Sequence, residues 1–194
     1  MTPATVVQGR SEESMKTTQA LLLGLTVVAL PLASLADEGS SPTASVEFLD
    51  NDGDVVGQGK IEQGPAGVVI NFSIDGLDKG WKAIHIHDAG TCDDHEEGFK
   101  ASGGHLNPED VKHGYLNPEG PDAGDLPNFA VHADGTAMVE MFNERASLDG
   151  SIGGNMLDDD GSALVIHENR DDHMAQPIGG AGARVACGVV QGDG

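Results

Sequence analysis

Short segments typical of β-strands, separated by turn residues, run through most of this 194-residue chain, and none shows a sustained helical period. Gly, Asn, Asp and Pro are concentrated between these segments, where turns require them. The pattern predicts an all-β domain, an eight-stranded antiparallel barrel or sandwich. The expected strands cover residues 44–49, 55–61, 67–74, 81–87, 129–132, 136–142, 162–167 and 184–190.

Two long stretches without strand patterns, residues 88–127 and 168–183, interrupt this series. A loop of such length in a compact domain is either functional or evidence against the assignment of elements. The first stretch contains His105, His113, Asp122 and Asp125. Metal binding by these side chains would explain how the loop stays ordered.

The first 36 residues have the pattern of a secretory signal that follows an internal start at Met15. Lys16 precedes an apolar run over 21–32, which is too short to span a membrane, and small residues stand at 34 and 36. We therefore expect 37–43 to be a flexible mature N-terminus and 44–194 to form one domain. The predicted destination is the periplasm or the extracellular space.

The acidic residues dominate the charge of the chain, with 32 Asp and Glu against 10 Lys and Arg, a net charge of −22. The 36-residue leader holds two residues of each sign, so the predicted mature domain carries all of this net charge. Such a surface argues against nucleic acid or an anionic membrane as a partner. It would suit surroundings of high salt, which screen self-repulsion.

The chain has two cysteines, Cys92 and Cys187. In an exported protein two cysteines favour one disulfide, and two buried free thiols are the alternative.

Five histidines stand in or beside these strand-like and glycine-rich segments. His85 and His87 are two apart in an expected strand, so their side chains share one face. A lone His-x-His is also common on a solvated strand face, but imidazole is the usual ligand of copper and zinc. Together with His105, His113 and His167 this pair predicts a metal centre. The remaining three histidines, His95, His132 and His173, are expected at the surface; His173 would at most modulate access to this centre.

Several motifs in this order resemble the copper/zinc superoxide dismutases, and specifically their exported bacterial branch. They are His85-Ile-His87, Gly104-His105-Leu-Asn-Pro, Gly124-Asp125-Leu-Pro, His167 with Asp171, and Gly182-Ala-Arg184-Val-Ala-Cys187-Gly, and the resemblance covers residues 44–190. It implies a Greek-key barrel, copper and zinc cofactors, and dismutation of superoxide to oxygen and hydrogen peroxide.

The resemblance also implies a role for each residue of these motifs. Copper would be held by His85, His87, His105 and His167. His105 would bridge copper to zinc and carry a proton to the substrate. Asp171 would accept hydrogen bonds from His85 and His113, and Arg184 would attract and orient superoxide. The resemblance allows a monomer or a homodimer.

The zinc ligands implied by the resemblance are His105, His113, Asp125 and a further histidine three residues before Asp125. This chain has Asp122 at that position. A carboxylate can ligate zinc, so we predict that Asp122 is the fourth ligand of a weaker zinc site. The alternative is that Asp122 is a plain loop residue and that zinc is weakly bound or absent.

Two alternative functions use the same fold. One is a copper-only dismutase, in which hydrogen bonds replace zinc in the loop. The other is a copper-binding module without turnover, which should lack the arginine or one copper ligand. This chain keeps Arg184 and all four histidines.

Overall fold

The computed structural model describes residues 41–194, and the predicted signal at 1–36 lies outside the described residues. Within 41–194 no residue is assigned to an α-helix, and no helix is long and apolar enough to cross a membrane. A seven-stranded antiparallel sheet dominates this part of the chain. The fold is therefore the all-β class that the sequence predicts.

The strands form two halves that meet where the first and last strands pair. One half runs in the order β1 (Thr43–Asp50), β2 (Val55–Gly64), β3 (Gly67–Ile74) and β7 (Ala137–Asn143). The other half contains β5 (Ile84–His87), β10 (Ala163–His167) and β11 (Arg184–Gly192), and β11 pairs with β1. β5 and β7 lie at opposite ends of this order, and the last strand returns to pair with the first, as in a Greek key.

The fourth expected strand, 81–87, is divided in the structure. β4 (Gly80–Lys82) pairs with β6 (Phe129–Val131), whereas β5 pairs with β10. Ala83 lies between the two strands, and its backbone N–H donates to the carbonyl of Asn169 in the second loop. The sequence also gave no indication of two short parallel strands, β8 (Ala146–Ser147) and β9 (Gly154–Asn155).

Alternating side chains of the strands fill the core. In β1, Ala44, Val46 and Phe48 point inward and are buried. Phe72 packs against Phe48 on one side and edge-on against the ring of Phe129 on the other, with ring centroids 5.6 and 5.2 Å apart. This continuous core supports the strands that carry the histidines.

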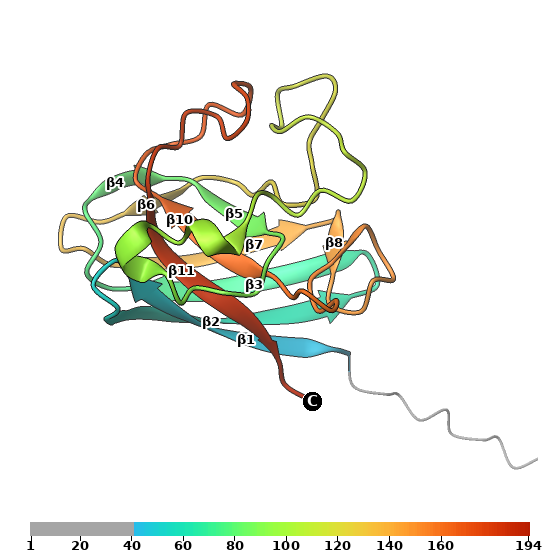
Figure 1. Ribbon diagram of the computed structural model, residues 1–194, viewed down its shortest axis with the longest axis horizontal. Helices are drawn as coiled ribbons and strands as arrows, with labels where there is room; N and C mark the ends of the chain where they lie inside the picture. The colour runs from blue at the N-terminus through green and yellow to red at the C-terminus, as the bar shows by residue number, and fades with distance from the viewer. Residues whose placement is uncertain (1–40) are drawn as a thin grey trace, which may run out of the picture. The chain divides into compact units, whose positions relative to one another are not determined.

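The later part of the first loop and the second loop rise on the same side of the barrel, the olive and red segments at the top of Figure 1. The first loop contains two short 3₁₀ turns, η1 (His95–Glu97) and η2 (Lys100–Ser102). The expected disulfide, Cys92–Cys187, is confirmed and ties this loop to β11. At the start of the described residues, the Pro42 carbonyl accepts the N–H of Gln63 in β2.

Candidate metal centre

Three histidines stand on the outer face of two neighbouring strands. β5 and β10 are buried on both faces. Ile84 and Ile86 belong to the barrel core, so the alternation of the strand turns His85 and His87 to the other face. Val165 of β10 pairs with His85, and His167 follows two residues later. The pleat of two strands therefore places three imidazoles together.

The first loop adds its ligand candidates by pairing with β5. His105 and Asp125 form isolated bridges with His87 and His85, respectively. The carbonyl of Gly124 accepts the N–H of Ile86 at 2.9 Å. A Cβ atom on Gly124 would lie 2.4 Å from the Ile86 carbonyl oxygen, so only glycine permits this approach.

Four ring nitrogens in this region are buried without any hydrogen-bond partner: His85 Nδ1, His87 Nε2, His105 Nε2 and His167 Nε2. Buried polar atoms normally have partners, so a convergent set without them indicates an absent ligand. The three strand histidines offer ligand atoms within 4.8 Å of one another, and the His85 and His105 rings lie 4.2 Å apart. We call His85, His87, His105 and His167 the four-histidine group.

The other ring nitrogen of each of these histidines has a hydrogen-bond partner, and this partner determines which nitrogen stays free. His87 Nδ1 is 3.1 Å from the Gly103 carbonyl, and His167 Nδ1 is 3.2 Å from the Gly182 carbonyl. His85 Nε2 lies 3.2 Å from Asp171 Oδ2. Such partners set the tautomer that leaves the other nitrogen free to coordinate. An all-imidazole donor set suits copper.

A second set of donors, His105, His113, Asp122 and Asp125, lies beside the first, and we call it the mixed group. Its ligand atoms also lie within 4.8 Å of one another. His105 Nδ1 is 3.0 Å from Asp122 Oδ2, and Asp122 Oδ1 is buried without a partner. His105 thus faces both groups, one nitrogen toward each. Two imidazoles and two carboxylates suit zinc.

Asp171 connects the two groups. Oδ2 faces His85 Nε2 at 3.2 Å, and Oδ1 faces His113 Nε2 at 3.1 Å. The hydrogen bonds from His113 and His85 outweigh burial and hold the pKa of Asp171 well below its usual range. The carboxylate is therefore an ionised acceptor for one histidine of each group.

The two groups differ in electrostatics. Burial lowers the pKa of His85 to about 3 and that of His167 to about 4. Burial also disfavours a charge on His113, but hydrogen bonds with Asp125 and Asp171 outweigh it and raise its pKa to about 10. His85 and His167 are thus neutral imidazoles, whereas in the metal-free protein His113 holds a proton that a zinc ion would replace.

Arg184 begins β11 opposite His167, where the pairing of β10 and β11 shifts register. Its guanidinium donates to Ser102 Oγ at 3.1 Å and to the Gly103 carbonyl at 2.7 Å, and also to the carbonyl of Phe99. These contacts hold a permanent cation in one orientation. Arg184, His87 and His105 line one pocket of about 410 Å³, so the cation lies beside the four-histidine group.

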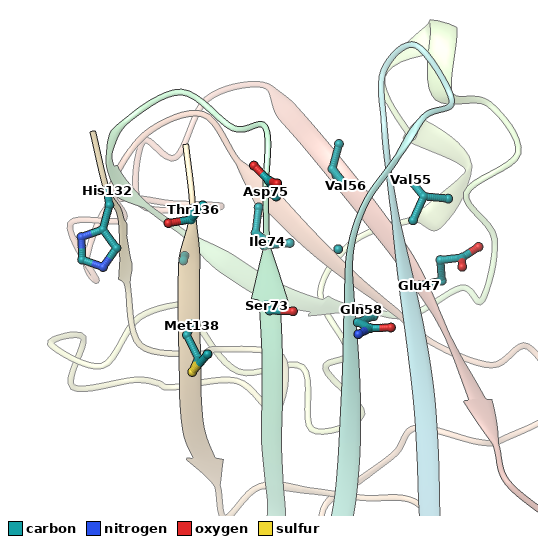
Figure 2. A pocket seen from close by; sticks show the side chains of 12 residues that line it. Glu47, Val55, Val56, Gln58, Ser73, Ile74, Asp75, His132, Thr136 and Met138 are labelled. Carbon is teal, nitrogen blue, oxygen red and sulfur yellow. The ribbon is translucent and has the colours of Figure 1, made fainter. Parts of the chain in front are cut away.

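A larger surface hollow of about 510 Å³ lies elsewhere, over β1, β2, β3 and β7. Figure 2 shows its lining side chains, among them Glu47, Ser73 and Met138. Of the eight histidines only His132 lines it, so it is separate from the metal centre.

Three residues at the centre, Lys112, Gln176 and His173, were not predicted from the sequence. Lys112 and Gln176 line the pocket that holds Arg184. The prediction that His173 is a plain surface residue is wrong: its side chain is 17% exposed and approaches Asp171. His132 is exposed and His95 partly so, as expected. No local pattern distinguishes these histidines, because the difference depends on where each loop folds.

Comparison with known proteins identifies the family. The sequence profile described as copper/zinc superoxide dismutase (SODC) matches residues 55–190. The chain belongs to this family. It is 44% identical to the Cu-Zn superoxide dismutase of Caulobacter vibrioides over 78% of the chain and 86% of that protein. With the Cu-Zn superoxide dismutase 2 of Aquifex aeolicus it shares 38% identity over 76% and 86%.

Solved structures show the same fold. A superoxide dismutase-like protein of Bacillus subtilis matches with a TM-score of 0.71 and 39% identity, over 75% of this chain and 96% of that one. The Cu/Zn superoxide dismutase of Brucella abortus matches with a TM-score of 0.61 and 27% identity, over 77% and 99%. The predicted fold class and family are confirmed.

Proposed function

We propose that this protein is an exported copper/zinc superoxide dismutase, in which the four-histidine group holds copper and the mixed group holds zinc. Two superoxide ions and two protons are converted to one O₂ and one H₂O₂. The observation that carries the proposal is the set of four partnerless buried ring nitrogens. Membership of the family and the histidine clusters support copper and zinc as cofactors.

Copper supplies the redox chemistry when bound, because it alternates between two oxidation states and so takes one electron and returns it. His85, His87 and His167 orient their free nitrogens through the partners described above. His105 presents Nε2 to the four-histidine group and Nδ1 to the mixed group. Nε2 is therefore positioned to hold a proton and to pass it to the reduced substrate.

Arg184 binds and orients the substrate in this proposal. Superoxide is a small anion, and the guanidinium is a cation held by three oxygen acceptors beside His87. A charge-assisted contact inside a pocket both attracts the anion and fixes its approach. The protein surface as a whole repels the anion, since the net charge is −22.

Asp122 is the proposed fourth zinc ligand. It is buried, its Oδ1 lacks a partner, and its Oδ2 faces His105. A copper-only enzyme would need this carboxylate to be satisfied by hydrogen bonds within the loop. The partnerless oxygen favours a metal ion instead.

We also propose that the protein is exported and that it binds neither nucleic acid nor membranes. It is either a monomer or a homodimer. The disulfide fits an oxidising compartment, and the acidic charge fits the absence of polyanionic partners. Sequencing the N-terminus of the mature protein checks cleavage after residue 36. Ultracentrifugation distinguishes the monomer from the homodimer.

Metal analysis joined to a superoxide assay tests the proposed activity. The mature protein should bind one copper and one zinc per chain and consume superoxide after copper loading. A protein that binds copper fully but shows no turnover would be the copper-binding module. Equal turnover with and without zinc, together with no zinc uptake, would identify the copper-only enzyme.

A further inference from the structure

His173 lies in the second loop and is fixed by its own backbone. Its N–H donates to Asp171 Oδ1 at 2.6 Å, and its carbonyl accepts the N–H of Leu116 in the first loop at 3.0 Å. Its φ is +59°, a region that histidine, asparagine and aspartate enter more readily than most residues. His173 therefore joins the second loop to the loop that carries the mixed group.

Asn128 defines which ring nitrogen of His173 carries the proton. The Asn128 Oδ1 accepts the N–H of Asp171 at 2.8 Å, and Nδ2 donates to the Asp171 carbonyl at 2.9 Å, so the amide has one orientation. The same Nδ2 lies 2.9 Å from His173 Nε2. An amide NH₂ only donates, so Nε2 must accept and the ring proton must be on Nδ1.

That Nδ1 is directed to the carboxylate that the two groups share. His173 Nδ1 is 3.1 Å from Asp171 Oδ2, and this buried nitrogen has no assigned hydrogen bond to any group of the described residues. This distance is within the range of a hydrogen bond, and the carboxylate oxygen is the ionised acceptor in reach of the Nδ1–H. Asp171 is then surrounded by three imidazoles, those of His85, His113 and His173.

We propose that His173 is a positioning residue, whose Nδ1–H holds the Asp171 carboxylate in the orientation that serves one histidine of each metal group. This inference rests on the proposed function. Two histidines and the His173 backbone N–H already contact the oxygens of Asp171, and the ring Nδ1–H adds a fourth donor that limits rotation of the carboxylate. Direct partners of metal ligands, such as Asp171, are worth about 10–100-fold in metal affinity or activity, and His173 acts through Asp171.

His173 could instead act only through the packing of its ring. Two variants separate this packing role from the positioning role of the Nδ1–H. His173 also packs edge-on against the Tyr115 ring, with centroids 5.3 Å apart. His173→Phe keeps a ring at this contact and removes both nitrogens. His173→Asn loses the ring but places an amide nitrogen where Nδ1 stands, and it accepts the positive φ. His132→Phe, at an exposed histidine, is the matched control.

The first measurement uses the metal-free wild-type protein and does not depend on turnover. In ¹⁵N-histidine spectra the His173 ring should carry its proton on Nδ1 at neutral pH. A proton on Nε2 would overturn the proposal. A failure of wild-type protein to bind copper and zinc would instead overturn the proposed function and leave this tautomer result intact.

The second measurement uses the copper- and zinc-loaded variants. The chelator concentration that removes half of the zinc should fall about ten-fold or more in His173→Phe, with a changed copper(II) electron paramagnetic resonance spectrum. His173→Asn should stay within about three-fold of wild type, as should His132→Phe. Wild-type zinc retention in His173→Phe, or equal losses in His173→Phe and His173→Asn, would overturn the proposal.

Discussion

Three of the four histidines in the four-histidine group stand on neighbouring strands, whereas every member of the mixed group stands in the first loop. The strand histidines are positioned by a pleat that the barrel core already requires. The loop donors are positioned by hydrogen bonds to each other, to β5 and to Asp171. We infer that the copper site is largely preformed and that the zinc site depends more on its own ligands.

The largest difference in kcat/KM is expected between two variants that each lose one ligand, one from each group. His87→Gln should lower kcat/KM by more than about 100-fold, because a ligand should matter at least as much as its outer partners. His113→Gln leaves the copper donors in place and should lower kcat/KM by less than about ten-fold. Stopped-flow superoxide consumption on protein of known copper content measures both. Equal losses would mean that the two sites form one unit.

Arg184 and Lys112 line the same pocket, but only Arg184 is held in one orientation, so their contributions to kcat/KM should differ. Arg184, fixed by three acceptors, should contribute one directed contact of about 1.5–3 kcal/mol, so Arg184→Ala should lower kcat/KM about ten-fold or more. Lys112, exposed on the first loop, should contribute less than about five-fold, as exposed charges usually do. Arg184→Lys should keep part of the attraction and lose the planar fork. Similar losses for Arg184→Ala and Lys112→Ala would show that orientation is unimportant.

Asp122 tests whether the mixed group is weak because of its composition. Asp122→His restores a third imidazole and should raise the chelator concentration needed to remove zinc, by about ten-fold. Asp122→Ala should lower zinc content. Copper content should change less than zinc content in either variant, because Asp122 contacts His105 and none of the three strand histidines. If zinc content in Asp122→Ala equals that of wild type, Asp122 is not a ligand.

The same contrast explains what could be predicted from the sequence. The all-β class, the disulfide and the convergence of His85 and His87 follow from alternation, cysteine count and strand period. The break at Ala83 and the partial burial of His173 depend on contacts that the second loop makes with other segments, which no local period encodes. The roles of Asp122 and Asp171 entered through the family resemblance.

The pH dependence of stability in the metal-free protein should also separate the groups. His85 and His167 have lowered pKa values, about 3 and 4, so their contribution is present above pH 6.5 and is lost as the pH falls toward those values. His113 has a raised pKa, about 10, so its contribution is present below pH 6.5 and is lost as the pH rises toward 10. Stability should therefore be highest near pH 6.5.

Urea midpoints at constant ionic strength measure this profile. The variant His113→Gln tests whether His113 causes the decline in stability above pH 6.5. In that variant the decline between pH 6.5 and 10 should shrink by at least about half, while the acid side keeps its slope. An unchanged alkaline decline would mean that general repulsion among the acidic side chains causes it. The ion pairs of His113 with Asp125 and Asp171 would then not hold the metal-free loop in place.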